Sequence, residues 1–301
     1  MTPQLCLGTA AFGGHDRTRY GLNARQAPTR EECVEMLRVA QRAGLALDTA
    51  AAYGVAEELI GGAVSPDVPL TTKLLPLLSV HPDHLSRLIA GEILASRSRL
   101  GRSLTGAVGV LFHTPQHGAD ERMVGALLAA RDAGLCSYAG TSVYFPSEFD
   151  ALVPGQDIVQ VPYSVFDRRF ADSGAFERAR ERGIRVYARS PFCQGLVVMA
   201  PEDVPERLAH ARPYVQVFRD VCGRFGVSPA EAAFRFALAS PAGYVVFGVD
   251  TIAQLEQNLA VASSVPPPGW HTLQAALVEA LGDLPEAVVV PSLWANHSPT
   301  G

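Results

Sequence analysis

Short apolar runs alternate with longer segments of helical periodicity along most of this chain. The runs predict eight β-strands, at residues 5–10, 45–48, 70–74, 108–113, 137–143, 158–163, 184–189 and 244–248. Each run is continuously apolar and does not alternate with polar residues, which is typical of parallel strands that are buried on both faces. We therefore expect a parallel sheet that is covered on both sides.

The segments between these runs carry apolar residues at helical spacing. They predict helices over residues 29–43, 83–100, 120–133, 174–182, 215–222, 228–238 and 252–261, with a short one from residue 56. The first helix has a capping box, Thr29 with Glu32, and ends at Gly44. Strands that alternate with helices over this length indicate the α/β class and favour a closed (β/α)8 TIM barrel. An open doubly wound sheet is the alternative, weakened because no G-x-G-x-x-G motif follows a strand.

One break interrupts the alternation near the C-terminus, where Val265 is followed by three prolines, Gly269 and Trp270. We predict one barrel domain over residues 1–301, with 264–301 as a C-terminal extension. The extension is expected to pack a helix over residues 271–281 on the barrel.

Composition narrows the possible partners. The 301 residues are 48% hydrophobic and 18% charged, with a net charge of −5 and no basic cluster. These values are typical of a soluble globular protein and argue against nucleic acid as a partner. No apolar run is long enough for a membrane span, and the N-terminus shows no secretion signal. The five cysteines are scattered and predict free thiols in a reducing compartment, the cytoplasm, with no metal site.

Candidate chemistry gathers at the ends of the second, third and fourth strands. Asp48, Lys73 and His113 end these strands, and Tyr53 lies on the loop after the second. Lys73 is the only lysine beside 24 arginines, so it marks a place where a compact, tunable cation is required. Each residue also has a structural interpretation, such as a cap, loop packing or a strand-end histidine. In a barrel, however, the strand ends converge on one face, where Lys73 can lower the pKa of Tyr53 and make it a general acid.

These residues resemble the motifs of the aldo-keto reductases. The resemblance rests on Asp48-Thr49-Ala50, Tyr53-Gly54, Glu58, Lys73 and Leu111-Phe112-His113-Thr114-Pro115, and extends over nearly the whole chain. It implies a β/α barrel that binds an extended nicotinamide dinucleotide, NADPH or NADH, without a Rossmann domain. By resemblance, Tyr53 is the proton donor, Asp48 and Lys73 tune it, and His113 positions the substrate.

The resemblance also implies a cofactor site along strands five to eight. Ser142 and Gln160 hold the nicotinamide carboxamide, and Arg189 stands where many members stack an aromatic ring on the nicotinamide. The remaining cofactor residues follow strands seven and eight: Ser190, Phe192, Gln194, Gly195, Leu196, Gly248, Asp250, Gln254, Gln257 and Asn258. Better-known members bind the 2′-phosphate with lysine and arginine, where this chain has Gly248 and Gln254. The nearby Asp250 favours a ribose hydroxyl, so NADPH and NADH both stay open.

The predicted substrate pocket is wide and polar. Small residues, Ala10 and Thr114, replace aromatic residues that narrow the pocket in small-aldehyde reductases, and Tyr20, Tyr163 and Phe166 are further pocket candidates. The sequence around Arg189 resembles a bacterial subgroup found among sugar and secondary-metabolite genes. We therefore predict reduction of a sugar-like or functionalised carbonyl by NAD(P)H. The alternatives are a sugar dehydrogenase that works in the oxidative direction and a cofactor-binding regulatory subunit with little turnover.

Overall fold

The computed structural model describes residues 3–13, 22, 27–77, 81–102 and 108–296. Eight parallel strands pair in sequence order, and β8 pairs back with β1 to close a barrel. The strands are β1 (Gln4–Gly8), β2 (Ala46–Asp48), β3 (Leu70–Leu74), β4 (Val108–Phe112), β5 (Tyr138–Ser142), β6 (Ile158–Pro162), β7 (Arg185–Arg189) and β8 (Tyr244–Phe247). This confirms the predicted (β/α)8 barrel, with strand bounds that lie within two residues of the predicted ones.

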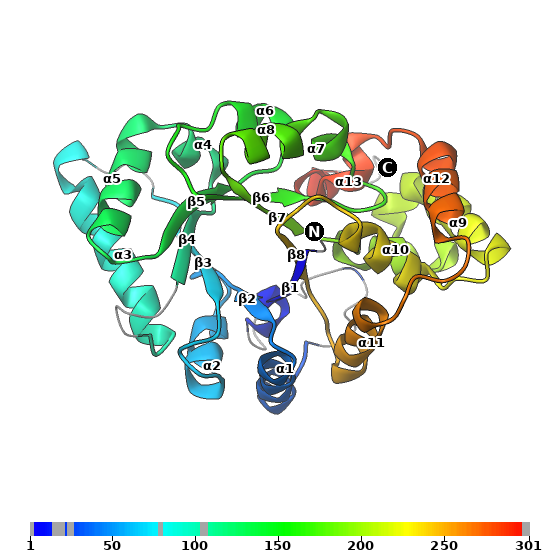
Figure 1. Ribbon diagram of the computed structural model, residues 1–301, viewed down its shortest axis with the longest axis horizontal. Coiled ribbons are helices and arrows are strands. Elements are labelled where there is room, and N and C mark those ends of the chain that lie inside the picture. Colours follow the sequence, from blue (N-terminus) through cyan, green and yellow to red (C-terminus); the bar gives the residue numbers. More distant parts are fainter. Residues whose placement is uncertain (1–2, 14–21, 23–26, 78–80, 103–107, 297–301) are drawn as a thin grey trace.

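Helices surround the strands on the outside (Figure 1). The longer helices are α1 (Arg30–Arg42), α2 (Ala56–Ala63), α3 (Leu85–Arg99), α5 (Glu121–Asp132), α8 (Ala175–Glu181), α9 (Arg212–Arg224), α10 (Pro229–Leu238), α11 (Ile252–Ser263) and α12 (Trp270–Leu281). Each corresponds to a segment of predicted helical periodicity. The sequence did not predict the single-turn helices α4 (Pro115–Gly118), α6 (Pro146–Asp150), α7 (Arg169–Asp172) and α13 (Glu286–Val289), which are too short to show a period.

Short 3-10 turns complete the chain: η1 (Ala10–Phe12), η2 (Pro82–His84), η3 (Cys193–Val198), η4 (Pro201–Asp203), η5 (Glu206–Ala211) and η6 (Pro291–Asn296). The sequence predicts no helix between residues 189 and 215, where the structure has η3, η4 and η5.

Local capping sets where the helices begin. The Thr29 backbone N–H donates to Glu32 Oε2 at 2.7 Å, and the Glu32 N–H donates to Thr29 Oγ1 at 3.2 Å. This is the predicted capping box of α1. Asp120 caps α5 in a simpler way, since its Oδ1 accepts from the N–H of Arg122 and of Met123. These contacts satisfy N–H groups that the first turn of a helix leaves unpaired.

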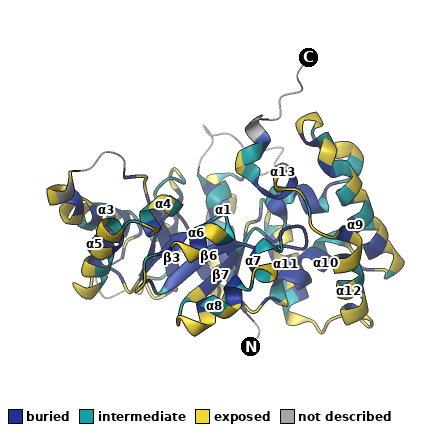
Figure 2. Cartoon of the chain, turned by 90° about the horizontal axis from the view of Figure 1, so that it is seen from above, coloured by how far each residue is buried: buried dark blue, intermediate teal, exposed yellow. Residues whose placement is uncertain are grey.

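Apolar side chains pack on both sides of the barrel wall. One cluster joins β1–β5 and β8 to the helices around them, and a second joins β6 and β7 to α8, α9 and α12. A small third cluster of Cys6, Ala46, Leu111, Ile158, Tyr187 and Val246 fills the barrel interior. Figure 2 shows this layering, with buried strands in the middle and exposed residues on the outer helix faces. All five cysteines are free and buried, as predicted.

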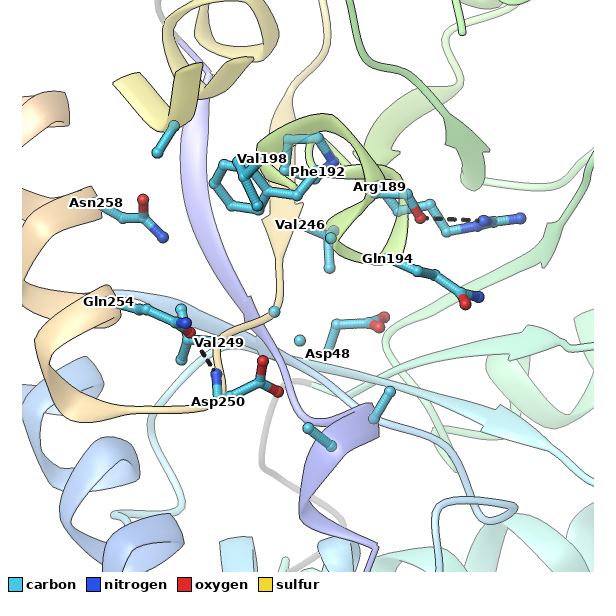
Figure 3. Close-up of a pocket in the computed structure, with 18 of the residues that line it drawn as sticks. Asp48, Arg189, Phe192, Gln194, Val198, Val246, Val249, Asp250, Gln254 and Asn258 are labelled. Atoms are coloured by element: carbon cyan, nitrogen blue, oxygen red, sulfur yellow. Dashed lines mark hydrogen bonds between the residues drawn. The ribbon is translucent and has the colours of Figure 1, made fainter. Parts of the chain in front are cut away.

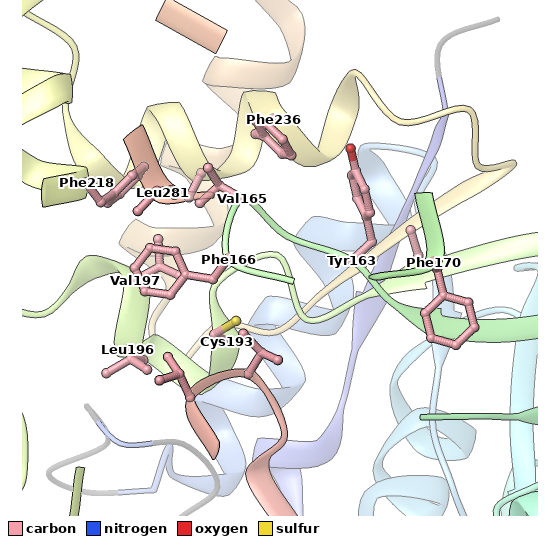
Figure 4. Packing of buried hydrophobic residues seen from close by; sticks show 14 of the residues in the cluster. Tyr163, Val165, Phe166, Phe170, Cys193, Leu196, Val197, Phe218, Phe236 and Leu281 are labelled. Carbon is pink, nitrogen blue, oxygen red and sulfur yellow. The ribbon is translucent and has the colours of Figure 1, made fainter. Parts of the chain in front are cut away.

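The second cluster contains two residues that the sequence analysis placed in the substrate pocket. Tyr163 is buried between Phe236, stacked at 5.8 Å between ring centroids, and Phe176, edge-on at 5.5 Å. Phe166 is buried edge-on against Phe218 (Figure 4). The prediction was wrong for both residues, because the chain after β6 turns these rings outward into the helix layer.

Candidate active site

A buried ion pair forms the floor of the site. Lys73 Nζ, on β3, lies 2.8 Å from Asp48 Oδ1 and 2.7 Å from Asp48 Oδ2, and it also donates to the backbone oxygen of Thr49 at 2.9 Å. The Lys73 side chain is 1% exposed and that of Asp48 6%. Three acceptors therefore take the three N–H groups of the ammonium. A guanidinium, with its planar fork, would not fit this tripod.

Asp48 has two further donors besides the lysine. Its Oδ1 accepts from Thr71 Oγ1 at 2.8 Å and from Gln160 Nε2 at 2.8 Å. Gln160 lies on β6, 112 residues after Asp48 in the sequence. The carboxylate thus joins β2, β3 and β6 across the barrel interior, and its donors fix its position closely.

Tyr53 and His113 lie above this pair. Lys73 Nζ is 5.5 Å from the centre of the Tyr53 ring, and the Tyr53 and His113 rings meet edge-on with centroids 5.9 Å apart. The four residues that the sequence analysis selected therefore come together at the carboxyl ends of β2, β3 and β4. These residues come from β2 and the loop after it, from β3 and from the end of β4. The closure of the barrel therefore brings them together.

The electrostatics of Tyr53 differ from the sequence expectation. Burial and the nearby Asp48 raise the pKa of Tyr53 well above its ordinary value, and Arg189 opposes them. The net direction is therefore opposite to the predicted one: burial and Asp48 outweigh any lowering by Lys73, which is itself paired with Asp48. Tyr53 is therefore a neutral phenol across the physiological range.

His113 is also neutral. Burial, followed by the charge of Lys73, lowers the pKa of His113 to about 4, although Asp48 acts in the opposite direction. A neutral imidazole carries one N–H donor and one acceptor. It can therefore donate a hydrogen bond to a carbonyl oxygen without competing with Tyr53 as a proton source.

An elongated cavity opens beside Asp48 and Tyr53 and runs to α11 (Figure 3). Many of the predicted cofactor and substrate residues line it: Ala10, Gln160, Arg189, Ser190, Phe192, Gln194, Gly195, Gly248, Asp250, Gln254, Gln257 and Asn258. Figure 3 shows Arg189 and Gln194 on one side of Asp48, and Asp250, Gln254 and Asn258 on the other. The cavity thus has a reactive end and a remote end.

The loop after β7 lines the middle of this cavity with unusual backbone. Ser190, Cys193 and Gln194 have φ values of 66°, 45° and 54°, a region that residues other than glycine rarely adopt. The Gln194 carbonyl accepts from the N–H of Leu22 at 2.7 Å, which ties this loop to the segment after β1. Strained backbone of this kind clusters at ligand sites, because the surrounding structure must hold it in place.

The remote end carries an acid and an amide with spare hydrogen-bonding capacity. Asn258 is 6% exposed, and its side chain makes no hydrogen bond to any residue that the structure describes. Burial raises the pKa of Asp250, whose backbone N–H donates to Gln254 Oε1 at 2.7 Å. A Cβ on Gly248 would meet only Gly8 O, at 4.0 Å, so the glycine leaves the cavity floor open. The unpartnered amide of Asn258 and the open space beside Gly248 suit the adenosine part of a nicotinamide dinucleotide.

Several predicted site residues do not line the cavity. Leu196 is fully buried in the core, and Ser142, beside Gln160 in register, is 2% exposed. Thr114 is the N-cap of α4 and lies outside the cavity wall. Tyr20 lies outside the described residues. The sequence identifies a strand end but cannot show which way its last side chains point.

Other cavity residues were missed. Gly8, Ala11, Pro191, Val198, Ala230, Val246 and Val249 also line the cavity. Most are small or apolar and carry no chemical signal. Tyr144 does not line the cavity itself but contacts Arg189, which does, and it was missed as well. An aromatic residue two positions after a strand end is a signal that could have been detected. The centre of the Tyr144 ring lies 4.4 Å from the guanidinium carbon of Arg189, so one face of this guanidinium is already covered.

Gly54→Ala tests how closely the loop that carries Tyr53 is held. Gly54 has a φ of 53°, and a Cβ there would lie 2.0 Å from Gly13 O, so the loop must move. A shift of about 1 Å at a catalytic group lowers turnover on the order of 10²-fold. Gly44→Ala is the control, since Gly44 also has positive φ but nothing lies within 4 Å of the added carbon. Turnover and melting temperature are measured for both variants. Equal turnover in the two would contradict the expectation that turnover depends on the exact position of Tyr53.

Comparison with known proteins gives a consistent family. The sequence model described as "Aldo/keto reductase family" matches residues 4–267. A "Probable pyridoxal reductase 2" of Schizosaccharomyces pombe is 26% identical over 164 residues, covering 46% of this chain and 49% of that protein. The match thus spans about half the length of this relative.

Solved structures share the fold. The aldo-keto reductase AKR11C1 from Bacillus halodurans, in its holo form, superposes with a TM-score of 0.71 at 19% identity, over 95% of each chain. The thermostable aldo-keto reductase Tm1743, in complex with the inhibitor epalrestat, gives 0.66 at 23% identity, over 91% of this chain and 95% of that one. PA4992, a putative aldo-keto reductase from Pseudomonas aeruginosa, gives 0.62 at 19% identity, over 87% and 90%.

Two kinds of site are absent from the part of the chain that the structure describes. No helix there is long and apolar enough to span a membrane. No group of three or more His, Cys, Asp or Glu side chains there comes together as metal ligands would.

Proposed function

This chain belongs to the Aldo/keto reductase family, and from that premise we propose that it reduces a sugar-like or otherwise functionalised aldehyde or ketone, with Tyr53 as proton donor. As a member of this family it is an NAD(P)H-dependent oxidoreductase that acts on small carbonyl compounds. The observation that carries the proposal is the buried Lys73–Asp48 pair below Tyr53, with the His113 ring edge-on beside it.

Tyr53 is the residue we assign to proton transfer. A reduced nicotinamide bound in the cavity would supply a hydride to the carbonyl carbon, and the carbonyl oxygen, with alkoxide character, would take its proton from Tyr53. An alkoxide is a stronger base than a phenolate, so a phenol with a raised pKa still donates its proton downhill. Lys73 and Arg189 then lie near the negative charge that develops on the tyrosine oxygen.

His113 would orient the substrate. Its neutral ring can donate one hydrogen bond to the carbonyl oxygen, which places that oxygen next to the Tyr53 hydroxyl. Such a donor polarises the carbonyl and fixes its distance from the proton source, and both effects lower the barrier.

The reductive direction fits the protonation state of Tyr53. Oxidation of an alcohol by the same groups would require the phenolate as base, and a raised pKa makes this form scarce near neutral pH. The same groups serve both directions, so an oxidative sugar dehydrogenase is the second candidate, and its rate should rise as the solution becomes more alkaline.

The direct test is consumption of NADH or NADPH on addition of an aldehyde. A sugar aldehyde such as glyceraldehyde and the aldehyde pyridoxal, named in the partly matching relative, are suitable first substrates. Consumption that depends on aldehyde and disappears in Tyr53→Phe would support the proposal. Tight cofactor binding without any carbonyl reduction would instead favour a regulatory subunit.

We expect NADH to bind within about tenfold of NADPH, a difference below about 1.4 kcal/mol. Among the described residues that line the cavity, Arg189 is the only basic one, and it lies at the reactive end, away from Asp250. An acid with no cation beside it repels a 2′-phosphate and can accept from a ribose hydroxyl. Fluorescence titration of the protein with each cofactor gives the two dissociation constants, and Asp250→Asn should shift the balance toward NADPH. A thousandfold preference of the unaltered protein for NADPH would contradict this assignment.

A further inference from the structure

Arg189 stands out as a guanidinium without a carboxylate partner at the reactive end of the cavity. Several other partly buried arginines pair with acids, for example Arg169 with Asp167 and Arg99 with Glu57. No residue within the described ranges forms an ion pair with Arg189. Since Asp48 and Lys73 offset each other, Arg189 gives the described residues at this end of the cavity a net positive charge.

The guanidinium is held in place by groups that carry no charge. It lies 4.4 Å from the centre of the Tyr144 ring, a distance at which a cation is attracted to an aromatic face. Nη2 donates to the backbone oxygen of Val143 at 3.2 Å, and Nη1 lies 3.4 Å from Ser190 Oγ. These contacts use two of the five N–H donors of the side chain. Arg189 is thus positioned, with most of its donors left for a ligand.

Its location connects this charge to the reaction. Arg189 is the last residue of β7 and lines the same cavity as Asp48 and Tyr53. Its charge reaches both Tyr53 and His113, where it opposes the rise in the pKa of the first and adds to the depression of the second. An anion bound to Arg189 would therefore lie close to a carbonyl bound between Tyr53 and His113.

We propose that Arg189, oriented by Tyr144, binds an anionic group of the substrate, so that the preferred substrates are carbonyl compounds that also carry a carboxylate or a phosphate. This inference rests on the proposed carbonyl reduction and specifies its substrate class. A planar guanidinium with free N–H groups matches both anions, because each offers paired oxygens. A neutral sugar aldehyde would leave this cation without a counter-charge in a partly desolvated site.

The test compares matched substrates. 4-Carboxybenzaldehyde and methyl 4-formylbenzoate differ in one negative charge, and glyceraldehyde 3-phosphate and glyceraldehyde form a phosphate pair. We expect the unaltered protein to show a higher kcat/KM for the anionic member of at least one pair. In Arg189→Met this anionic-to-neutral ratio should fall on the order of 10–100-fold, mostly through KM, the range expected for a charge-assisted hydrogen bond. The carboxylate and phosphate pairs show separately which anion is recognised.

Arg185→Met is the matched control. Arg185 lies on the same strand and also stacks on a tyrosine, 5.1 Å from the centre of the Tyr138 ring, but at the opposite end of the barrel. In Arg185→Met the anionic-to-neutral ratio of kcat/KM should stay that of the unaltered protein. Tyr144→Leu should lower the ratio in part, and Tyr144→Phe, which keeps an aromatic face, should retain it. Equal loss for the charged and neutral substrates in Arg189→Met would overturn the proposal and assign Arg189 to the cofactor or to the fold.

Binding without turnover separates this inference from the proposed function. Calorimetric titration with benzoate and with benzamide, in the presence of oxidised cofactor, measures anion binding directly. Benzoate should bind more tightly than benzamide, and Arg189→Met should remove the difference. If no aldehyde is reduced but benzoate selectivity is present, the proposed function fails and the anion site stands. If reduction occurs without benzoate selectivity or a charge-dependent ratio, the anion site fails and the proposed function stands.

Discussion

Tyr53→Phe is expected to lower the turnover of carbonyl reduction by about 10²–10⁴-fold, the usual contribution of a positioned general acid. The substitution removes only the hydroxyl, so the ring contact with His113 and the packing above Lys73 remain. The dissociation constants of NADH and NADPH should change little, because most cavity-lining residues lie on β7, β8 and the segments after them. Steady-state turnover and cofactor titration on the same preparation check both statements.

The pH profile of the unaltered protein complements this variant. The pKa of Tyr53 is raised, so the proton donor stays loaded, and His113, with a pKa of about 4, stays neutral above that pH. The rate of reduction should therefore be flat between about pH 6 and pH 9, below the ordinary tyrosine pKa of about 10. The rate of alcohol oxidation, which needs the phenolate, should rise with pH over the same range. A reductive rate that falls above pH 7, together with near-normal turnover of Tyr53→Phe, would remove Tyr53 from the role of proton donor.

Lys73→Met is expected to reduce both turnover and stability. The variant leaves the Asp48 carboxylate buried without its cation, and breaking a buried pair in this way costs about 3–5 kcal/mol. Thr71 and Gln160 still donate to Asp48 and keep part of its stabilisation. Turnover should fall on the order of 10²–10⁴-fold, because the floor below Tyr53 loses its geometry. Urea unfolding and steady-state kinetics measure the two losses.

Three further variants separate the effect of the buried ion pair on stability from its effect on turnover. Asp48→Asn combined with Lys73→Met removes both charges, so the free energy of unfolding should return toward that of the unaltered protein while turnover stays low. Arg42→Met breaks the exposed pair with Glu35 and should change the free energy of unfolding by about 0–1 kcal/mol. Lys73→Arg keeps the charge but not the three-acceptor geometry, and should also turn over slowly. Near-normal turnover in Lys73→Arg would show that the position of the ammonium does not matter.

The elements of the barrel could be predicted from local pattern. Apolar runs, the Thr29 capping box and glycines such as Gly44 act over a few residues, and their effects do not depend on distant contacts. The predicted strand and helix bounds are therefore close to the observed ones. Single-turn helices such as α4 and α6 carry no periodicity, and the sequence did not indicate them.

The four residues of the reactive site could also be selected from the sequence. Asp48, Lys73 and His113 are polar positions at or just beyond the ends of apolar strands, and Lys73 is the only lysine. A polar group at the carboxyl end of a barrel strand faces the shared ligand site, so its place in the chain predicts its place in space. The structure adds their partners, such as the contact of Asp48 with Gln160 across the barrel.

The tertiary structure decided which way side chains point and how the charges around each group add up. Tyr163 and Phe166 follow the end of β6, as predicted, but their rings point into the helix layer. The sequence could not show this direction, because both faces of the sheet are apolar and periodicity cannot distinguish them. The pKa of Tyr53 is raised, not lowered, because burial and then the charge of Asp48 act on the buried phenol. The contact of Arg189 with Tyr144 joins β7 to the segment after β5, and only barrel closure brings these two residues together. Local sequence therefore determined which chemical groups reach the site, and the three-dimensional packing determined their charge states, their partners and the side of the barrel they face.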